Sequence, residues 1–397
     1  MSGSAALALR DDLLVRYASR PKSKHIPCSA HGLKVRVLAS VLLACWLGVA
    51  RPVVAETAAP AEVPIPEEPP VFVQPSAVGD LEYRAGRGFR VGNSGFTIGG
   101  FSTLLADYKE GGDTRVTLDD LNLFTIFDPS PYFHVFSELG FQNLIELGDE
   151  ETEPEPRDTV TVDRLYGDLN VNDRLNLRFG KFFTPVGRWN QIPAEPLVWT
   201  NSRPLITEGP FDEQVTGGML WGSLYPAEGS FTYTAYGQFL QPLDPDSRIP
   251  PAHRSAGLRL EYDALGNWAV GGSYFASTRL GYWNNVGGFD VLWRNETSEV
   301  MGEFLAGRGD PAGQHLLGFY LQGVHEVVRT LSLVGRYEYF DPGAPEPAVN
   351  LFDLGLSWRP SPYIVINLDY LIAGRTGGID RSEQNGPGFR ISLSFLL

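Results

Sequence analysis

The stretch Arg174-Leu-Asn-Leu-Arg-Phe-Gly-Lys-Phe-Phe183 decides the fold that we predict for this chain of 397 residues. Its first half alternates apolar with polar side chains, which is typical of a β-strand whose two faces meet different surroundings. The chain continues as Thr184-Pro-Val-Gly-Arg-Trp-Asn190, and strand pattern returns only near Val215. An irregular segment of about 25 residues is too long for a plain turn, so residues 184–211 are a candidate functional loop.

From about Ser94 onward the chain repeats this unit of alternating strand and turn. Clear examples are Phe231-Thr-Tyr-Thr-Ala-Tyr-Gly-Gln-Phe239 and Phe389-Arg-Ile-Ser-Leu-Ser-Phe395. Residues 94–397 hold about 16 such units, each long enough for a tilted strand of ~10 residues that crosses a bilayer, plus a connection. The sequence therefore predicts an all-β, antiparallel, up-and-down transmembrane barrel of about 16 strands. A soluble β-sandwich would show the same alternation.

The order of the connections favours the membrane barrel over the sandwich. Short turns such as Asp128-Pro-Ser-Pro131 and Asp263-Ala-Leu-Gly266 alternate with longer polar connections, and only residues 279–283 are short on the long side. An even number of strands then puts both barrel ends on the short-turn side, which faces the periplasm in outer-membrane barrels. Aromatic residues also gather at the ends of the apolar faces, as interfacial girdles require, at Tyr262, Trp268, Trp293, Tyr339, Trp358 and Tyr370.

The N-terminal region has the pattern of an export signal. An apolar run from Val37 to Ala50 follows the basic residues Lys34 and Arg36, and Val53-Val-Ala55 fits a cleavage site. We predict residues 1–55 to be a signal peptide with an extended n-region, which a translation start near Leu33 or Val35 would shorten. Residues 56–93 would be a Pro-rich periplasmic leader and approach to the barrel, and residues 94–397 the barrel itself.

Composition after residue 55 excludes several classes of function. Cys28 and Cys45 both precede the predicted cleavage site, so disulfide and thiol chemistry are excluded from the exported chain. That chain would contain 24 Lys and Arg against 45 Asp and Glu, which argues against nucleic acid as a partner. The four histidines beyond residue 55 show no metal or triad spacing, so we predict no catalytic residue, cofactor or metal site.

The residues Leu177-Arg-Phe-Gly-Lys-Phe-Phe-Thr-Pro-Val-Gly187 resemble the strand-to-loop "GKF-TPFG" pattern of the phosphate-selective porin O/P family. The resemblance is strong in this stretch, and in the rest of the chain it is limited to the repeated pattern of alternating strands and turns. It implies an outer-membrane porin that forms a homotrimer. Residues 184–211 are the third connection on the long-loop side, the one that general diffusion porins fold into the barrel. Lys109 and Lys181 are the only lysines after residue 55, a departure that puts phosphate specificity in doubt.

Charged side chains opposite the apolar faces are the candidates for the pore lining, because polar strand residues of a membrane barrel must face a wet lumen. The alternative is that each pairs with a neighbouring opposite charge and only stabilises the wall. The candidates are Arg178, Arg259, Arg336, Arg359, Arg390, Glu138, Asp168, Glu261, Glu338, Asp353 and Asp369.

The long loop adds its own charges, namely Arg188, Glu195, Arg203 and Glu208, with Asp212 and Glu213 just past its end. If it folds inward, we expect its carboxylates to face wall arginines across a narrow gap and to create a transverse field. If it does not, it is an extracellular flap. The last strand, 389–397, alternates as the barrel-assembly machinery requires of a C-terminal strand, but ends in Leu397 rather than Phe or Trp.

The sequence thus predicts a porin in the Gram-negative outer membrane, in contact with membrane lipid, that lets small hydrophilic solutes or ions diffuse passively. No reaction is expected. The rival interpretations are a structural or adhesive barrel and a lipase-like enzyme, which would need a Ser/His pair near one rim.

Overall fold

The computed structural model describes residues 71–76, 79–110, 114–142, 144–148, 160–192, 195–243, 252–264, 266–279, 281–309, 314–343, 346–375, 378–379 and 387–397. The predicted signal peptide and the first part of the predicted leader, residues 1–70, lie outside the described residues.

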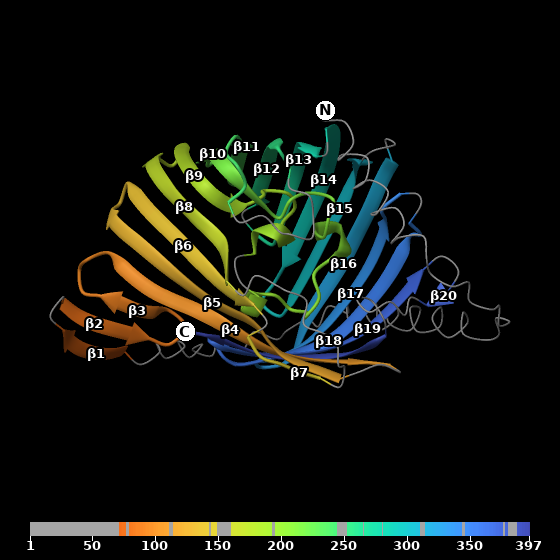
Figure 1. The fold of residues 1–397 in the computed structure, drawn as a ribbon, viewed down its shortest axis with the longest axis horizontal. Helices are drawn as coiled ribbons and strands as arrows, with labels where there is room; N and C mark the ends of the chain where they lie inside the picture. Colours follow the sequence, from red (N-terminus) through yellow and green to blue (C-terminus); the bar gives the residue numbers. More distant parts are fainter. Residues whose placement is uncertain are drawn as a thin grey trace, which may run out of the picture. The chain divides into compact units, whose positions relative to one another are not determined.

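Sixteen antiparallel strands close into one barrel (Figure 1). Each strand pairs with the next along the chain, and the ring closes where β21 pairs with β4 from Gly388↔Lys109 to Leu396↔Phe101. The ring strands are β4 (Phe96–Lys109), β5 (Thr114–Ser130), β6 (Phe133–Gln142), β8 (Val160–Asn172), β9 (Leu175–Phe183), β10 (Gln214–Leu224), β11 (Gly229–Gln238), β12 (Arg254–Ala264), β13 (Trp268–Arg279), β14 (Tyr282–Arg294), β15 (Ser298–Gly309), β16 (Gln314–Val328), β17 (Leu331–Asp341), β18 (Val349–Ser361), β19 (Ile364–Arg375) and β21 (Gly388–Leu396). The predicted fold class is therefore confirmed.

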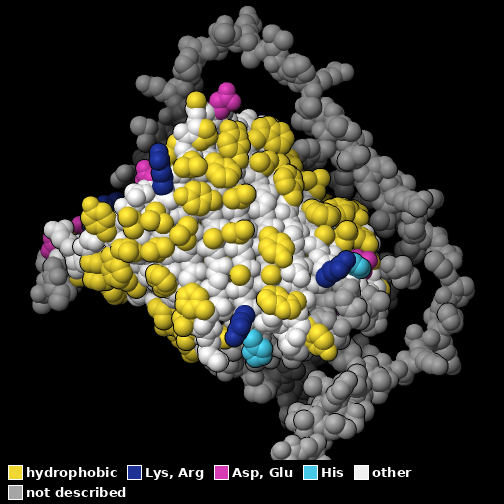
Figure 2. Space-filling view, turned by 90° about the horizontal axis from the view of Figure 1, so that it is seen from above, with side chains coloured by type: hydrophobic (Ala, Val, Ile, Leu, Met, Phe, Trp, Pro, Cys, Tyr) yellow, Lys and Arg dark blue, Asp and Glu magenta, His cyan; other side chains and the backbone are white. Residues whose placement is uncertain are grey.

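The two faces of the wall differ as the alternation in sequence predicts. Along β12, Leu258 and Leu260 point outward and are 55% and 50% exposed, whereas Arg259 between them is 3% exposed. Figure 2 shows one face of the molecule on which hydrophobic side chains predominate and charged ones lie mainly near the margin. Since every ring strand is hydrogen-bonded on both sides, the backbone is satisfied within the wall and an apolar outer surface can face lipid.

The short connections gather at one end of the barrel, where β4 begins and β21 ends. Trp268 and Trp293 are cross-strand partners at this end, with ring centroids 6.3 Å apart, and Trp358 is 47% exposed. These positions match an aromatic girdle at the periplasmic interface. At the other end, β7 (Glu146–Gly148) pairs with β5 and β20 (Gly378–Ile379) with β19, which lengthens the wall locally.

Three short strands precede the barrel within the segment expected to be leader and approach. They are β1 (Val71–Ser76), β2 (Gly79–Arg84) and β3 (Gly88–Val91). They form a meander, and β3 pairs with the start of β4, where β21 has already ended. Tyr83 stacks on Phe72 and makes a tilted ring contact with Phe89 across this meander. Aromatic cross-strand pairs stabilise small sheets, which explains why this part of the segment is ordered.

The connection between β9 and β10 contains three 3-10 helices, η1 (Trp189–Gln191), η2 (Glu195–Leu197) and η3 (Leu205–Thr207). None of the helices in the described part of the chain is long and apolar enough to cross a membrane. Trp189, Leu205 and Ile206 are buried, although they belong to a connection. The contacts that bury them lie inside the barrel and define the candidate site.

Candidate functional site

The loop from Thr184 to Glu213 is closed at its base. The Thr184 amide donates to the Glu213 carbonyl at 2.8 Å, and the Thr184 hydroxyl donates to the Asp212 carbonyl. The side-chain amide of Asn190 donates to both the Thr184 and Glu213 carbonyls, at 2.9 and 3.0 Å. The two ends of the loop therefore lie next to each other, and the residues between Thr184 and Glu213 project from this closed base.

The descending limb is attached to the wall by its backbone. Gly187 has a φ of 64°, and a Cβ there would lie 2.0 Å from a carboxylate oxygen of Glu303. This absence of a side chain lets the amides of Arg188 and Trp189 donate to Glu303 Oε1 on β15 at 2.9 and 2.6 Å. The Tyr320 hydroxyl donates to the same oxygen at 2.8 Å. The glycine that closes the resemblance motif is thus needed where the loop turns into the lumen.

Arg188 completes this attachment with its side chain. Its guanidinium bonds Glu261 on β12 at 3.1 Å and Asp290 on β14 at 3.2 Å. The wall residue Arg259 bonds the same two carboxylates, at 2.8 Å to Glu261 and 2.5 Å to Asp290. Two guanidinium groups and two carboxylates thus form a neutral, charge-assisted cluster that fixes the loop to β12 and β14.

The tip of the loop reaches the short-turn end of the barrel. The Trp199 indole donates to Glu299, the second residue of β15, at 3.1 Å. Arg359, near the end of β18, lies 4.1 Å above the centre of the Trp199 ring and donates to the Val198 carbonyl at 2.9 Å. The loop consequently spans most of the length of the lumen.

The ascending limb is attached to β17, β18 and β19 through buried carboxylates, and to β21 through the Asn201 side chain, which accepts a hydrogen bond from the Ser392 hydroxyl. The Asn201 amide donates to Asp369, and the Ser202 hydroxyl donates to Asp353 at 2.6 Å. The Leu205 amide donates to Glu338 at 2.6 Å. Arg336 holds this group together, since it bonds Glu338 at 2.7 Å and Asp353 at 3.3 Å. It also donates to the Thr200 hydroxyl at 2.6 Å and the Ser202 carbonyl at 2.9 Å.

Apolar packing fills the space between this loop and the wall. Ile206 sits against β16, where a Cβ at Gly318 would come within 2.5 Å of its side chain. The cluster consists of Phe182, Val186, Trp189, Ile206, Phe211, Val215, Tyr236, Phe275, Val286, Met301, Leu305 and Tyr320. Because burial of these side chains removes much apolar surface from water, the loop is a packed element rather than a free flap.

The wall on the other side of the lumen carries its own pairs of charges. Arg178 on β9 bonds Asp168 on β8 through two nitrogens, at 2.7 and 2.8 Å, and its guanidinium lies 3.6 Å from the centre of the Tyr166 ring. Arg390 on β21 pairs with Asp107 on β4 at 3.6 Å. Arg164 on β8 pairs in the same way with Glu138 on β6.

On the loop, Arg203 bonds Glu213 at 2.6 Å, and Asp212 is bonded by Arg279 of β13 at 2.5 Å. Burial raises the pKa of Asp212, and Arg279 partly offsets this effect. Glu208 is exposed to lumen water, yet protein surrounds it on most sides. This desolvation raises its pKa above the ordinary 4.5, opposed by Arg203 and Arg390.

The structure brings most of the sequence-predicted wall residues together in pairs or in contact with the loop. Arg336, Glu338, Asp353 and Asp369 are at most 2% exposed, and Glu138, Asp168 and Arg259 at most 6%. On the β12–β19 side the arrangement of charge is the reverse of the one we expected. Wall carboxylates there bind the amides and Arg188 of the loop, whereas loop carboxylates were expected to face wall arginines. The pair of Asp212 with Arg279 is an exception and has the expected arrangement. The side chain of Glu195 lies outside the described residues.

Sequence reasoning missed four acidic residues of this site, namely Asp107, Asp290, Glu299 and Glu303. Inward-facing apolar residues such as Met301 and Leu305 flank Glu303 on its own face. The wall behind the loop is therefore apolar on both faces, and the alternation that identifies inward positions disappears there.

The structure also bears on the rival enzymatic interpretation. Ser298 and His325, cross-strand partners on β15 and β16, lie 2.9 Å apart at the short-turn end. No acidic side chain bonds His325 in the part of the chain that the structure describes, so a third member of a triad is missing there. The described residues also contain no group of three or more His, Cys, Asp or Glu side chains placed to hold a metal ion.

A closed ring of antiparallel strands with an apolar outside and charged groups inside is a transmembrane β-barrel, the architecture of Gram-negative outer membranes. The chain is 23% identical over 335 residues to an uncharacterised protein of Aquifex aeolicus, covering 70% of this chain and 75% of that protein. No protein-family profile matches the sequence.

Solved structures show the same fold. OmpF of Salmonella typhi in complex with daunomycin has a TM-score of 0.55 at 10% identity, covering 77% of this chain and 99% of that one. An anion-selective porin from Comamonas acidovorans has a TM-score of 0.52 at 12% identity, covering 76% and 99%. The trimer form of OmpT, an outer-membrane protein of Vibrio cholerae, has a TM-score of 0.52 at 10% identity, covering 76% and 99%. At these identities the likeness concerns the fold.

Proposed function

We propose that this protein is an outer-membrane porin, through which small hydrophilic solutes or ions diffuse passively. The path lies between the inward-folded loop and the wall formed by β4–β9 and β21. The observation that carries the proposal is the one-sided attachment of the loop. Most of its hydrogen bonds lead to β12–β15 and β17–β19, while β21, which the loop contacts at Ser392, borders both the loop and the path. A barrel of this strand number is wide enough for an aqueous channel beside the loop.

The charges that face this path form the proposed filter. Arg390 and Asp107 belong to the wall, with side chains 19% and 21% exposed, and Arg203 belongs to the loop at 34%. Glu208 stands across from Arg390, close enough for the arginine to lower its pKa. A transverse arrangement of opposite charges orders polar solutes and slows apolar ones, as charged rings do in other channels. The constriction role of residues 184–211 is part of this proposal.

Reconstitution of the purified protein in planar bilayers tests the proposal. We expect discrete conductance steps, together with liposome swelling in sugars that declines as the sugar grows. Absence of conductance and of swelling, in a preparation that is folded by circular dichroism, would leave the structural or adhesive barrel as the better interpretation.

A change of pH tests the filter. Glu208 has a raised pKa, so it loses its negative charge at a higher pH than a free glutamate as the solution is acidified. We expect the cation preference of the channel to fall as pH decreases through a midpoint above 4.5, measured as reversal potential in a salt gradient. The Glu208→Gln variant should lack this step and show the low-pH selectivity at all pH values. A step that persists unchanged in that variant contradicts the assignment.

Selectivity for phosphate, which the porin O/P resemblance implies, receives less support. Arg164, Arg178, Arg259 and Arg336 each lie against a carboxylate, so their positive charge is compensated. We therefore infer a mixed, weakly selective path rather than an anion channel.

We also propose a homotrimer, by analogy with the trimer form of the Vibrio protein. Native mass spectrometry of the detergent-extracted protein should give three times the mass of the exported chain. A single-chain mass under several mild detergents would contradict the trimer.

For the lipase-like rival, a phospholipid hydrolysis assay decides. We expect no activity that depends on Ser298. Hydrolysis by the wild type that Ser298→Ala abolishes would favour the enzyme.

A further inference from the structure

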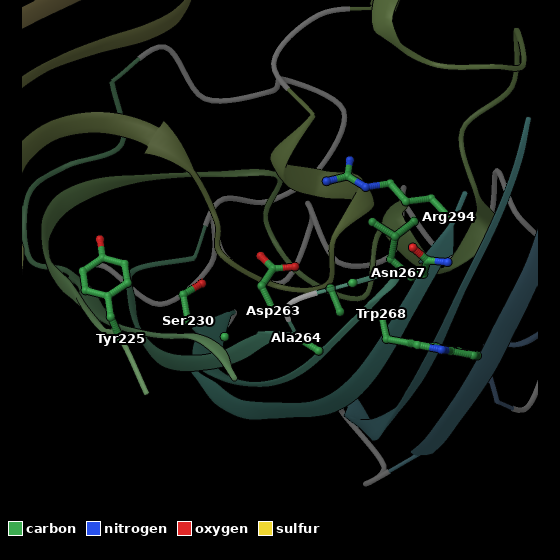
Figure 3. Close-up of a pocket in the computed structure, with 11 residues that line it drawn as sticks. Tyr225, Ser230, Asp263, Ala264, Asn267, Trp268 and Arg294 are labelled. Carbon is green, nitrogen blue, oxygen red and sulfur yellow. The ribbon is translucent and has the colours of Figure 1, made fainter. Parts of the chain in front are cut away.

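A cavity of about 330 Å³ lies at the short-turn mouth of the barrel, between β11 and β14 (Figure 3). Asp263 and Arg294 stand on either side of it, with Ala269 and Leu292 between them. Ser230, Asn267 and the aromatic residues Tyr225 and Trp268 complete the surroundings. The volume falls at the lower end of the range for small-molecule sites, so the cavity has room for a small solute.

The register places this cavity on the lumen side of the wall. Asp263 is four residues beyond Arg259 on β12, and Arg294 four residues beyond Asp290 on β14. Arg259 and Asp290 face the loop, and residues separated by an even number along a strand share a face. The cavity therefore lies below the cluster of Arg188, Arg259, Glu261 and Asp290, at the short-turn end of the lumen.

The spacing of the two charges follows from the strand order. Asp263 pairs with Ala269, and Ala269 pairs with Leu292, so one whole strand separates β12 from β14 at this level. Two strand spacings amount to about 10 Å between backbones. Ala269 carries the smallest apolar side chain and leaves the space between them open. In Figure 3 the Asp263 carboxylate and the Arg294 guanidinium extend on the same side, while Trp268 points away.

Unlike the arginines and carboxylates deeper in the lumen, Asp263 and Arg294 make no ion pair with each other or with any neighbour among the described residues. The Arg294 amide donates to the Asn267 carbonyl at 2.9 Å, which holds its backbone without engaging the guanidinium. One full negative and one full positive charge thus border the same small cavity, and both keep their hydrogen-bonding capacity for a solute.

We propose that this cavity binds a small zwitterion of the α-amino acid class at the periplasmic mouth. The Arg294 guanidinium would bind the solute carboxylate, for which its planar donors are suited, and the Asp263 carboxylate would bind the ammonium group. A solute with only one of the two charges would leave the other wall charge without a partner. The inference rests on the proposed passage of small hydrophilic solutes, and it names a class of them.

Binding of L-alanine, propionate and ethylamine to the full exported chain in lipid nanodiscs tests the proposal, with saturation-transfer NMR as the readout. Propionate is L-alanine without its ammonium group and ethylamine is L-alanine without its carboxylate, so the three probes carry both charges, only the carboxylate, or only the ammonium. We expect L-alanine to bind about threefold more tightly than either other probe, which corresponds to about 0.65 kcal/mol and lies within the range for one exposed charge pair.

Variants locate the effect. Asp263→Asn and Arg294→Gln should each weaken L-alanine about threefold, and the exchange of both charges, Asp263→Arg with Arg294→Asp, should restore binding. Asp173→Asn and Arg174→Gln are the matched controls, because these exposed residues lie on another turn of the same rim. These two variants should leave the binding of L-alanine unchanged.

Equal binding of the three probes, or L-alanine binding that is indifferent to Asp263 and Arg294, would overturn the proposal. Conductance measured on the same preparation separates this failure from failure of the porin function. A conducting protein that does not prefer L-alanine refutes the site alone. A preparation that prefers L-alanine but does not conduct refutes the porin and leaves the site.

Discussion

Arg336→Met is expected to destabilise the barrel by about 3–5 kcal/mol, because it leaves buried carboxylates without their partner. Arg336 is fully buried, and it joins Glu338 and Asp353 of the wall to Thr200 and Ser202 of the loop. Methionine has a similar volume but no charge. We therefore expect a lower midpoint of urea unfolding, together with noisier single-channel currents as the ascending limb comes loose.

Two further variants separate this effect from a general loss of arginine. Arg329→Met changes an exposed residue in the turn between β16 and β17 and should leave the midpoint unchanged within error. The triple variant Arg336→Met, Glu338→Gln, Asp353→Asn removes the uncompensated charge and should recover much of the stability. If the Arg336→Met variant is as stable as the wild type, the Arg336 cluster does not hold the loop.

Replacement of residues 188–208 by a short Gly/Ser link is expected to raise single-channel conductance by roughly twofold or more, since a barrel of this size is otherwise wide enough for an aqueous channel. The Thr184 amide already bonds the Glu213 carbonyl, so the link can close the loop without moving β9 or β10. The excision would also expose the carboxylates that the loop buries in the wild type, and their negative charge should shift the selectivity toward cations. These carboxylates are Asp290, Glu303, Asp353 and Asp369.

The control for this excision is a shortening of the connection between β11 and β12, residues 239–253, which should leave the conductance close to wild type. The excised protein must first show a folded barrel by circular dichroism and by its heat-dependent mobility in gels. An unchanged conductance in a folded barrel would mean that the loop does not form the constriction.

Prediction from sequence succeeded where the signal is local. Alternation along 257–262 and 389–395 predicted strands that exist, and the lengths of the turns predicted the side on which the barrel begins and ends. Prediction was less complete for residues 71–91, because the Pro-rich composition of the segment suggested a leader and approach to the barrel. The strands there depend on pairing within a meander and with β4, which composition does not reveal. Glu303 and Asp290 escaped notice because the wall behind the loop is apolar on its inner face as well.

By itself, the sequence determined a membrane barrel of about 16 strands with one long third loop, since period-two alternation and turn length are properties of neighbouring residues. Tertiary structure alone decided how the loop is held and which charges remain free. Leu205 meets Glu338, and Arg188 meets Glu261, across separations of 133 and 73 residues. Closing the ring brings such residues together, and the preference of buried amides and guanidinium groups for carboxylate partners then selects the arrangement.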